Sequence, residues 1–201
     1  MKELIISILR ESADLKLRFA KESISDVSDA AAILQKSIKS GGKVLIFGNG
    51  GSAADSQHIA AELVNKYKQK RRALPALALT TDSSILTSIA NDGSFDDVFS
   101  RQIEALGKKG DVALGITTGG KSGNVIKALK TAKSMDLRTI AFTGPDTSKI
   151  RRITDCRISV PSTSTPRIQE LHITIAHIIC ELLEESFSQK KEPAKNENSQ
   201  K

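Results

Sequence analysis

The spacing of apolar residues changes near residue 40. Over residues 1–39 they recur every three or four positions, with a break at 23–26, which predicts two helices. Beyond residue 40, short apolar runs typical of buried strands alternate with longer amphipathic stretches typical of helices. Strands are expected at KVLIFG, LPALALTTD, DVALGI, LRTIAFTG and CRISVP. Helices are expected at SAADSQHIAAELVNKY with Ser52 as its N-cap, SSILTSIAND, SFDDVFSRQIEALG, NVIKALKTAKSM and residues 166–187.

This alternation predicts an α/β fold. We expect one five-stranded parallel sheet with helices on both faces, the three-layer arrangement of flavodoxin-like and Rossmann-like folds. Residues 1–187 should form a single domain, with the helices of about residues 1–39 as an N-terminal extension. Residues 188–201 are polar and rich in lysine, so their composition predicts a disordered basic tail.

Composition narrows the class of protein. The 201 residues are 39% hydrophobic and 26% charged, an ordinary soluble balance, and no segment reaches the length of a membrane span. The first residues carry acidic side chains among the apolar ones and do not read as a signal peptide. Cys156 and Cys180 form no C-x-x-C pair. We therefore expect a cytoplasmic protein with reduced thiols and no membrane partner.

The net charge of +7 raises the question of nucleic-acid binding. Its densest source is residues 66–72, with five basic side chains, but aromatic residues are only 3% of the chain. Few side chains can therefore stack on bases. We interpret the charge as a solvated rim or a counter-charge to an anionic substrate, and a nucleic-acid partner is not expected.

The sequence GITTGGKS, residues 115–122, matches the P-loop pattern G-x-x-x-x-G-K-[ST]. A strand is predicted before it and a helix after it, so backbone N–H groups and the helix dipole should attract a phosphate. A second loop, GNGGS at 48–52, fits a relaxed dinucleotide fingerprint. Neither has the acidic residue that a nucleotide site needs, because Asp82 lies 34 residues after Gly48, and three residues separate Asp146 from the apolar run before it. No nucleotide cofactor is expected, and a P-loop phosphotransferase is the weaker alternative.

Polar residues on two predicted helices suggest acid–base or metal chemistry. His58 and Glu62 lie four residues apart on one helical face after the first loop, so both can face the same pocket. Gln169 and His177 lie eight apart on one side of another helix, and isoleucines surround His177. Each of them could instead face solvent or make a single hydrogen bond. An unpaired imidazole among apolar side chains would be costly, so the group together indicates a site.

These motifs together resemble the phosphoheptose isomerases, a family within the sugar-isomerase (SIS) domains. The likeness extends to about residue 187 and is carried by GNGGS, QHIAAEL, the Ala90-Asn91-Asp92 turn, GDVALGITTGGKSGNVIKAL, the end of CRISVP and RIQELHITIAHII. It implies a homotetrameric isomerase with active sites between subunits. The expected reaction converts sedoheptulose 7-phosphate to D-glycero-D-manno-heptose 7-phosphate, at the start of heptose synthesis for bacterial surface polysaccharide.

The resemblance also assigns roles to individual residues. Glu62 and His177 would perform acid–base catalysis, which suits an enediol reaction that moves a proton between adjacent carbons. Zinc, which some members bind, would be held by His58, Glu62, Gln169 and His177. The residues expected to bind the phosphorylated seven-carbon sugar are Asn49, Gly50, Gly51, Ser52, Asn91, Asp92, Thr117, Thr118, Gly119, Ser122 and Gln169.

The chain departs from the family pattern at five positions, which leaves the exact sugar open. The family usually has serine at Thr117 and Gly119, asparagine at Lys121, arginine at Lys66 and aspartate at Pro166. A non-catalytic alternative is a relative that associates with the bacterial replication initiator and lacks the glutamate corresponding to Glu62. The presence of Glu62 favours the enzyme.

Overall fold

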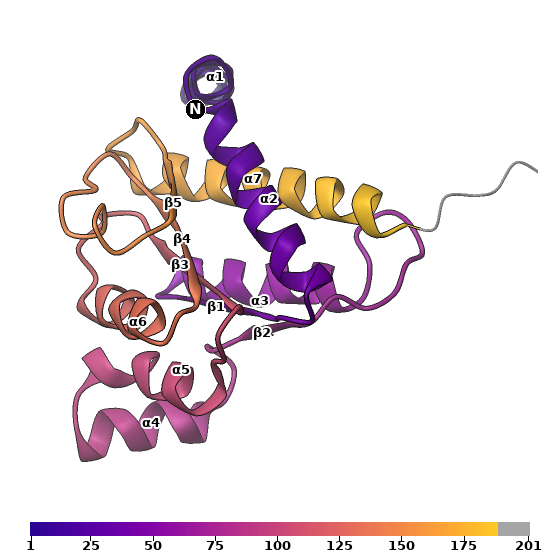
Figure 1. The fold of residues 1–201 in the computed structure, drawn as a ribbon. Helices are drawn as coiled ribbons and strands as arrows, with labels where there is room; N and C mark the ends of the chain where they lie inside the picture. Colours follow the sequence, from indigo (N-terminus) through magenta and orange to yellow (C-terminus); the bar gives the residue numbers. More distant parts are fainter. Residues whose placement is uncertain (189–201) are drawn as a thin grey trace, which may run out of the picture.

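Five of the apolar runs form the strands of one parallel sheet, as predicted (Figure 1). The computed structural model describes residues 1–188. The sheet order is β2-β1-β3-β4-β5, and each neighbouring pair is parallel. The strands are β1 Val44–Gly48, β2 Ala76–Ala78, β3 Val112–Thr117, β4 Arg138–Thr143 and β5 Cys156–Ser159.

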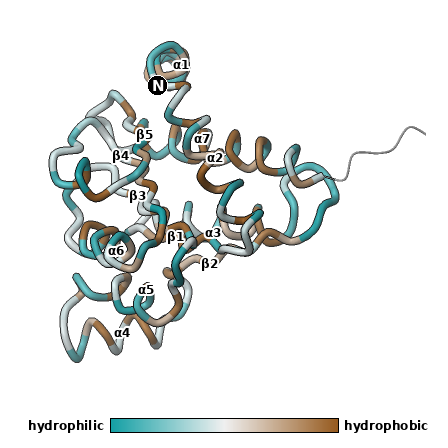
Figure 2. The backbone as a smooth tube through the Cα atoms, in the orientation of Figure 1, coloured by the Kyte–Doolittle hydropathy of each residue, from teal (hydrophilic) through white to brown (hydrophobic). Residues whose placement is uncertain are grey.

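Helices cover both faces of the sheet, which gives the predicted three layers (Figures 1 and 2). Along β1, Val44 and Ile46 face one core, whereas Leu45 and Phe47 face the other, because successive strand side chains alternate. The first core is shared with α2 Ile24–Lys39, α3 Gly51–Val64 and α7 Thr165–Phe187. The second is shared with α4 Ser83–Asp92, α5 Ser100–Leu106 and α6 Gly123–Ser134. Val98 and Phe99, which follow a 3₁₀ turn at Phe95–Asp97, also belong to it.

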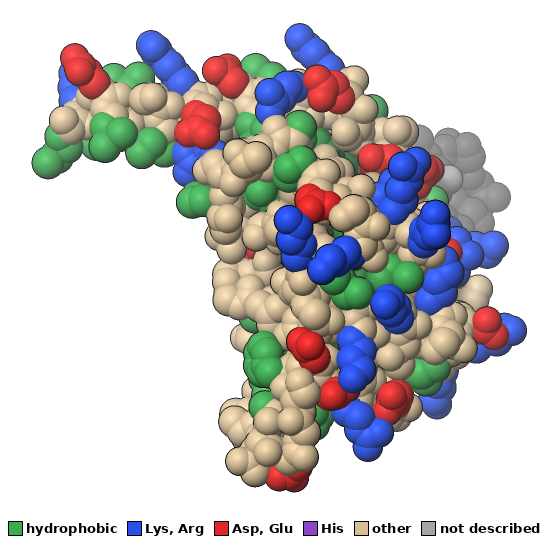
Figure 3. Space-filling model, turned by 90° about the vertical axis from the view of Figure 1, so that its left-hand side faces the viewer, with side chains coloured by type: hydrophobic (Ala, Val, Ile, Leu, Met, Phe, Trp, Pro, Cys, Tyr) green, Lys and Arg blue, Asp and Glu red, His purple; other side chains and the backbone are tan. Residues whose placement is uncertain are grey.

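The N-terminal helix α1, Lys2–Glu22, is largely unpacked. It buries only Leu15 and Phe19, and residues 1–11 are all exposed, including Leu4 and Leu9 at 64% each. In Figure 3 the helix projects as an arm at the top of the molecule, with hydrophobic side chains along it. The predicted N-terminal helical extension is thus present, with its break at Ser23.

Three details of the predicted helices change. Ser52 is not the N-cap of α3, because the helix begins at Gly51 and its N-cap is Gly50, which has a positive φ of 57°. Ser52 is buried in the first turn instead, beside Gly48. The helix ends at Val64 rather than near residue 67, and the predicted helix at 94–107 is divided into the 3₁₀ turn and α5.

Two other predictions concern membranes and the tail. None of the helices in residues 1–188 is both long and apolar enough to cross a membrane. The tail predicted at 188–201 lies outside the described residues, apart from Ser188.

Candidate active site

Two glycine-rich loops lie side by side at the carboxyl ends of β1 and β3. The strands are neighbours in the sheet, with Gly48 paired to Ile116. The side-chain amides of Asn49 and Asn124 exchange two hydrogen bonds of 2.9 Å, which tie the first loop to α6. We call residues 48–52 and 117–122 the loop half of the site. Because α3 and α6 begin here, backbone N–H groups and helix dipoles favour an anion at this edge.

The hydroxyl groups predicted to hold phosphate lie in this loop half. Thr117 Oγ1 and Ser122 Oγ are 3.1 Å apart, and Ser122 is the N-cap residue of α6. Ser52 is buried in the first turn of α3. Gly120 has a φ of 64°, and a Cβ there would lie 1.9 Å from the Asp146 carbonyl oxygen. This turn therefore requires glycine.

The first glycine of the P-loop pattern lies within a strand rather than in the loop. Gly115, its first glycine, lies inside β3, where a Cβ would be 3.0 Å from Val125 Cγ1 and 3.1 Å from Phe47 Cε2. It therefore serves packing between the sheet and α6, and the strand continues to Thr117. Lys121 Nζ lies 3.2 Å from Asp146 Oδ2. Hydrogen bonds from Ser148 and this lysine lower the pKa of Asp146 to about 2.

The predicted catalytic residues form a cluster between α3 and α7, which we call the helical half of the site. His58 Nε2 lies 3.3 Å from Glu62 Oε1 and 3.3 Å from His177 Nε2. The imidazole rings of His58 and His177 meet edge to face, with centroids 5.0 Å apart. A carboxylate and two imidazoles can transfer protons or bind a metal ion.

The donor set fits zinc. One ligand atom from each of His58, Glu62 and His177 lies within 4.8 Å of the others. A tetrahedral zinc ion takes nitrogen and oxygen ligands at about 2.0–2.2 Å, which places neighbouring ligand atoms about 3.3–3.5 Å apart. Two of the three separations, His58 to Glu62 and His58 to His177, are 3.3 Å and match that spacing. The cluster can thus supply three ligands for a metal ion.

Within one chain, the two halves are separated along α3 and α7, which run parallel. A Cβ on Gly51 would lie 2.5 Å from Gln169 Nε2, whereas His177, farther along α7, meets His58. Gln169 and His177 are eight residues apart, or about 12 Å along the helix. The single chain therefore does not bring Gln169 to the cluster, and His58 and Glu62 lie farther from the loop half than the sequence suggested.

Asn91 and Asp92 also lie apart from the helical half. They are exposed in the last turn of α4, and Asn91 Nδ2 donates to Asp92 Oδ1 at 2.8 Å. Helix α4 packs on the opposite face of the sheet from α3 and α7 (Figure 1).

The buried histidine of α7 is His172, which the sequence analysis missed. It is 1% exposed, its Nε2 lies 3.2 Å from the Thr143 carbonyl oxygen, and within residues 1–188 its Nδ1 has no partner. Burial lowers the pKa of His172 to about 4, although the hydrogen bond opposes this shift. His177 is only partly buried and Ile178 is 46% exposed. The isoleucines do not enclose His177, because only part of that helical face is covered.

Four of the five departures from the family pattern lie at exposed positions, whereas Thr117 is buried. Pro166 lies in the first turn of α7, where its fixed φ suits a helix start, and it is exposed. Apart from Gly119 and its two chain neighbours, no described residue has an atom within 4 Å of a Cβ built on Gly119. Lys66 and Lys121 are exposed. Nothing in this chain excludes the usual family residue at Gly119.

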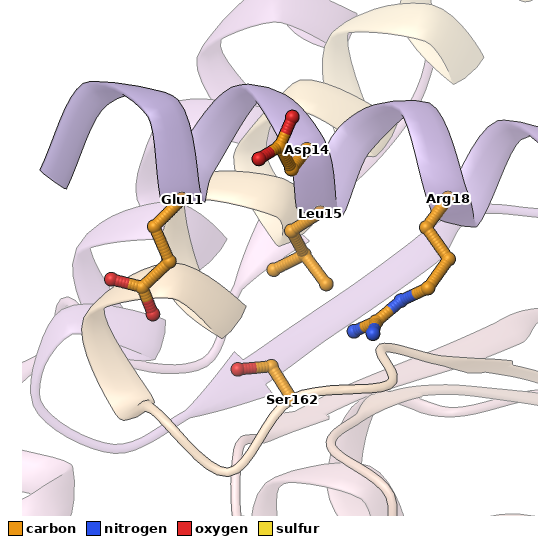
Figure 4. Close-up of a pocket in the computed structure, with 5 residues that line it drawn as sticks. All are labelled: Glu11, Asp14, Leu15, Arg18 and Ser162. Atoms are coloured by element: carbon orange, nitrogen blue, oxygen red, sulfur yellow. The ribbon is translucent and has the colours of Figure 1, made fainter. Parts of the chain in front are cut away.

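A separate hollow lies between α1 and the turn before α7 (Figure 4). It encloses about 290 Å³, and Leu15 and Arg18 extend from α1 toward Ser162. Arg18 also donates to the Pro161 carbonyl. None of the residues predicted to bind substrate lines it.

Known proteins match this chain along nearly its whole length. The SIS domain family model matches residues 9–144. A phosphoheptose isomerase of Aquifex aeolicus is 54% identical over 185 residues, 92% of this chain and 97% of that protein. The solved phosphoheptose isomerase of Neisseria gonorrhoeae is 42% identical with a TM-score of 0.86, over 92% of this chain and 98% of the other. That of Francisella tularensis is 33% identical with a TM-score of 0.87, over 91% and 97%.

The same chain thus has the SIS fold, two hydroxyl-lined loops at one edge of its sheet, and a carboxylate–imidazole cluster on adjoining helices. Its identity to proteins of one enzyme group exceeds what fold alone would explain. The chain belongs to the SIS domain family and, within it, to the phosphoheptose isomerases.

Proposed function

We propose that the protein is a ketose–aldose isomerase that converts sedoheptulose 7-phosphate to D-glycero-D-manno-heptose 7-phosphate. The observation that carries the proposal is the juxtaposition of Glu62 with His58 and His177, 3.3 Å between successive partners. The names of the similar isomerases support a phosphorylated heptose as the substrate. The product would enter heptose synthesis for bacterial surface polysaccharide, and the two free, buried thiols suit a reducing cytoplasm.

The reaction requires a base and an acid that act on adjacent atoms. Glu62 takes a proton from C1 of the ketose, the C1–H electrons form the C1=C2 bond, and His177 protonates O2 to give an enediol. Glu62 then returns its proton to C2 while His177 accepts the O1 proton, which leaves an aldehyde at C1. Both residues end in their starting protonation states.

The loop half would hold the far end of the substrate. The hydroxyls of Ser52, Thr117, Thr118 and Ser122, with the backbone around Gly50, Gly51 and Gly119, suit a phosphate. Asn49, Asn91, Asp92 and Gln169 are the candidates for the sugar hydroxyls. Because the phosphate does not react, its binding energy can position C1 and C2.

We further propose that two copies of the chain complete each site, within a homotetramer. The separation of the halves along α3 and α7 supports this, because a loop from one copy can approach the cluster of another. The unpacked apolar side chains of α1 provide a surface for assembly, with Leu4, Leu9 and Leu17 each 64% exposed. Light scattering at micromolar concentration should give a tetramer, and a monomer with full activity would contradict shared sites.

Zinc is the metal that we assign to His58, Glu62 and His177. When bound, it would polarise the sugar oxygens as a Lewis acid. Gln169 could join such a site only from another copy, given its distance from the cluster along α7. Metal analysis of the purified protein and of His58→Ala tests this assignment, and equal zinc content in both would contradict it.

The central experiment incubates purified protein with sedoheptulose 7-phosphate and follows the aldehyde-derived anomeric proton by NMR. Unphosphorylated sedoheptulose is the matched control, because it keeps the reacting atoms and removes the anchor. We expect turnover of the phosphate ester and little of the free sugar. Failure to form aldose, with or without added zinc, would overturn the proposed function.

A further inference from the structure

A buried ion pair joins the segment after α3 to the end of α7. The side chains of Arg71 and Glu184 are 0% and 2% exposed, and Arg71 Nε lies 3.7 Å from Glu184 Oε1. Neither belongs to the residues assigned to substrate, catalysis or metal. Two charges removed from water this completely require further polar partners.

Glu184 finds those partners in the backbone of the basic segment at 66–72. Its carboxylate accepts N–H bonds from Tyr67 at 2.9 Å and from Lys68 and Gln69 at 2.7 Å each. Burial alone would raise the pKa of Glu184, but these N–H groups and Arg71 outweigh it and lower the pKa. Glu184 thus fixes the segment to α7 in its ionised form.

Arg71 holds the carboxyl end of α3. Its guanidinium donates to the carbonyls of Glu62 at 2.7 Å, Leu63 at 2.8 Å and Asn65 at 3.2 Å. These carbonyls belong to the final turn and the C-cap, which leave acceptors without helical partners. No basic residue lies in the last turn of α3 itself, so Arg71 also supplies the cation that the helix dipole favours.

These contacts converge on the helical half of the site. Arg71 binds the backbone carbonyl of Glu62, the proposed base. Glu184 binds the backbone of Tyr67, whose ring packs on His177 with centroids 5.4 Å apart and planes 30° apart. His177 and Glu184 are seven residues apart on α7, about two turns, and so lie on one side of it.

We propose that Arg71 and Glu184 are positioning residues that set the placement of Glu62, Tyr67 and His177 relative to one another. The inference rests on the proposed isomerase function for its kinetic consequence, but its geometric content is independent of that function. A base displaced by about 1 Å can lose up to about a hundredfold in rate. The loop half makes none of these contacts, so substrate affinity should change little.

A comparable pair elsewhere in the fold provides the control. Asp111, at the amino end of β3, is 4% exposed and accepts backbone N–H bonds of 2.9 Å from Lys43 and Lys108. It also pairs with Lys43 Nζ. Asp111→Asn therefore removes a buried carboxylate with similar backbone partners, and within residues 1–188 its hydrogen bonds reach neither α3 nor α7.

The kinetic test compares Glu184→Gln with Asp111→Asn at a temperature where circular dichroism shows both folded. We expect kcat of Glu184→Gln to fall at least about tenfold with KM within about threefold, and kcat of Asp111→Asn to stay within about twofold. Arg71→Lys, which keeps the charge but loses the forked donor geometry, should show an intermediate fall in kcat. If Glu184→Gln does not fold, Arg71→Lys alone provides the kinetic test. The proposal would be overturned if Glu184→Gln and Arg71→Lys lost as much thermal stability as Asp111→Asn but kept the kcat of the wild type.

A second measurement separates this inference from the isomerase function. The chain has three histidines, so their imidazole NMR signals can be assigned with single substitutions. In Glu184→Gln the His177 signals should move, because the Tyr67 ring shifts, whereas the Asp111→Asn spectrum should keep them. An unmoved His177 signal would overturn the positioning role even in an active enzyme. A moved signal would support it even if the wild-type protein did not isomerise the sugar.

Discussion

The two halves of the site are constructed differently. The loop half depends on backbone conformation, with Gly50 and Gly120 at positive φ, and on short hydroxyl side chains. The helical half depends on longer side chains from α3 and α7, whose spacing is fixed by an ion pair between Arg71 and Glu184. Under the proposed function, this difference should allow substrate anchoring and proton transfer to be perturbed separately. Loop substitutions should act mainly on KM, and helix substitutions mainly on kcat.

The largest expected effect belongs to Glu62→Gln. The amide keeps the shape of the side chain but cannot accept the C1 proton, so turnover should fall at least about a hundredfold. Solvent-deuterium exchange at the reacting carbon should fall equally, while sugar-phosphate binding stays within about tenfold, or about 1.4 kcal/mol. Full exchange in this variant would exclude Glu62 as the base.

Gly120→Ala should produce the main effect on the loop half. The methyl group would meet the Asp146 carbonyl, and the residue would keep an unfavourable positive φ, so the turn must rearrange at about 1–3 kcal/mol. We expect KM to rise about tenfold with a smaller change in kcat. Gly119→Ser is the matched neighbour, because its Cβ meets open space and the family usually has serine there. Equal KM and kcat values for Gly120→Ala and Gly119→Ser would contradict the special requirement for glycine at position 120.

His172 should make the α7 side of the fold sensitive to acid. Its folded-state pKa, about 4, is below the ordinary value of 6.5, so the unfolded chain binds more protons between those pH values. Stability should therefore decrease as pH falls from about 6.5 to about 4, by up to about 1.4 kcal/mol per unit. Urea unfolding of wild type and His172→Gln at several pH values tests this prediction. If the free energy of unfolding changed with pH by the same amount in both proteins, the prediction would be contradicted.

The smallest effect is expected for Lys121→Asn. The side chains of Lys121 and its partner Asp146 are 66% and 39% exposed, and such surface pairs contribute little to stability, so activity should stay within about threefold of wild type. Calorimetry with MgATP should show no binding in either protein. MgATP binding that this substitution abolished would restore the P-loop interpretation.

Much of the fold followed from local patterns. The strands and the break near Ser23 were predictable because apolar period and helix capping act over a few residues. The loop half was visible for the same reason, since GNGGS and TTGGKS are contiguous. The early end of α3 could not be predicted in this way. It depends on Arg71, which binds the last carbonyls of the helix, and on Glu184, which lies 113 residues beyond Arg71 in the sequence.

The arrangement of the site required three-dimensional information. The sequence spacing predicted that His58 and Glu62 share one helical face and that Gln169 and His177 share another. It could not show that the two helices, α3 and α7, run parallel. It therefore did not show the separation between Gln169 and the cluster. The apolar run around His177 also did not indicate which histidine is enclosed, because that depends on the face of α7 that meets the sheet, and this face carries His172.

The unpacked length of α1 has a consequence for the life of the protein in the cell. Under the proposed assembly, a newly synthesised subunit would display Leu4, Leu9 and Leu17 until it meets other copies. Such apolar helices are what chaperones and proteases recognise on incomplete assemblies. Under the proposed assembly, subunits made in excess would be removed while assembled ones persist. The amount of enzyme would then be set by the rate of association as well as by the rate of synthesis.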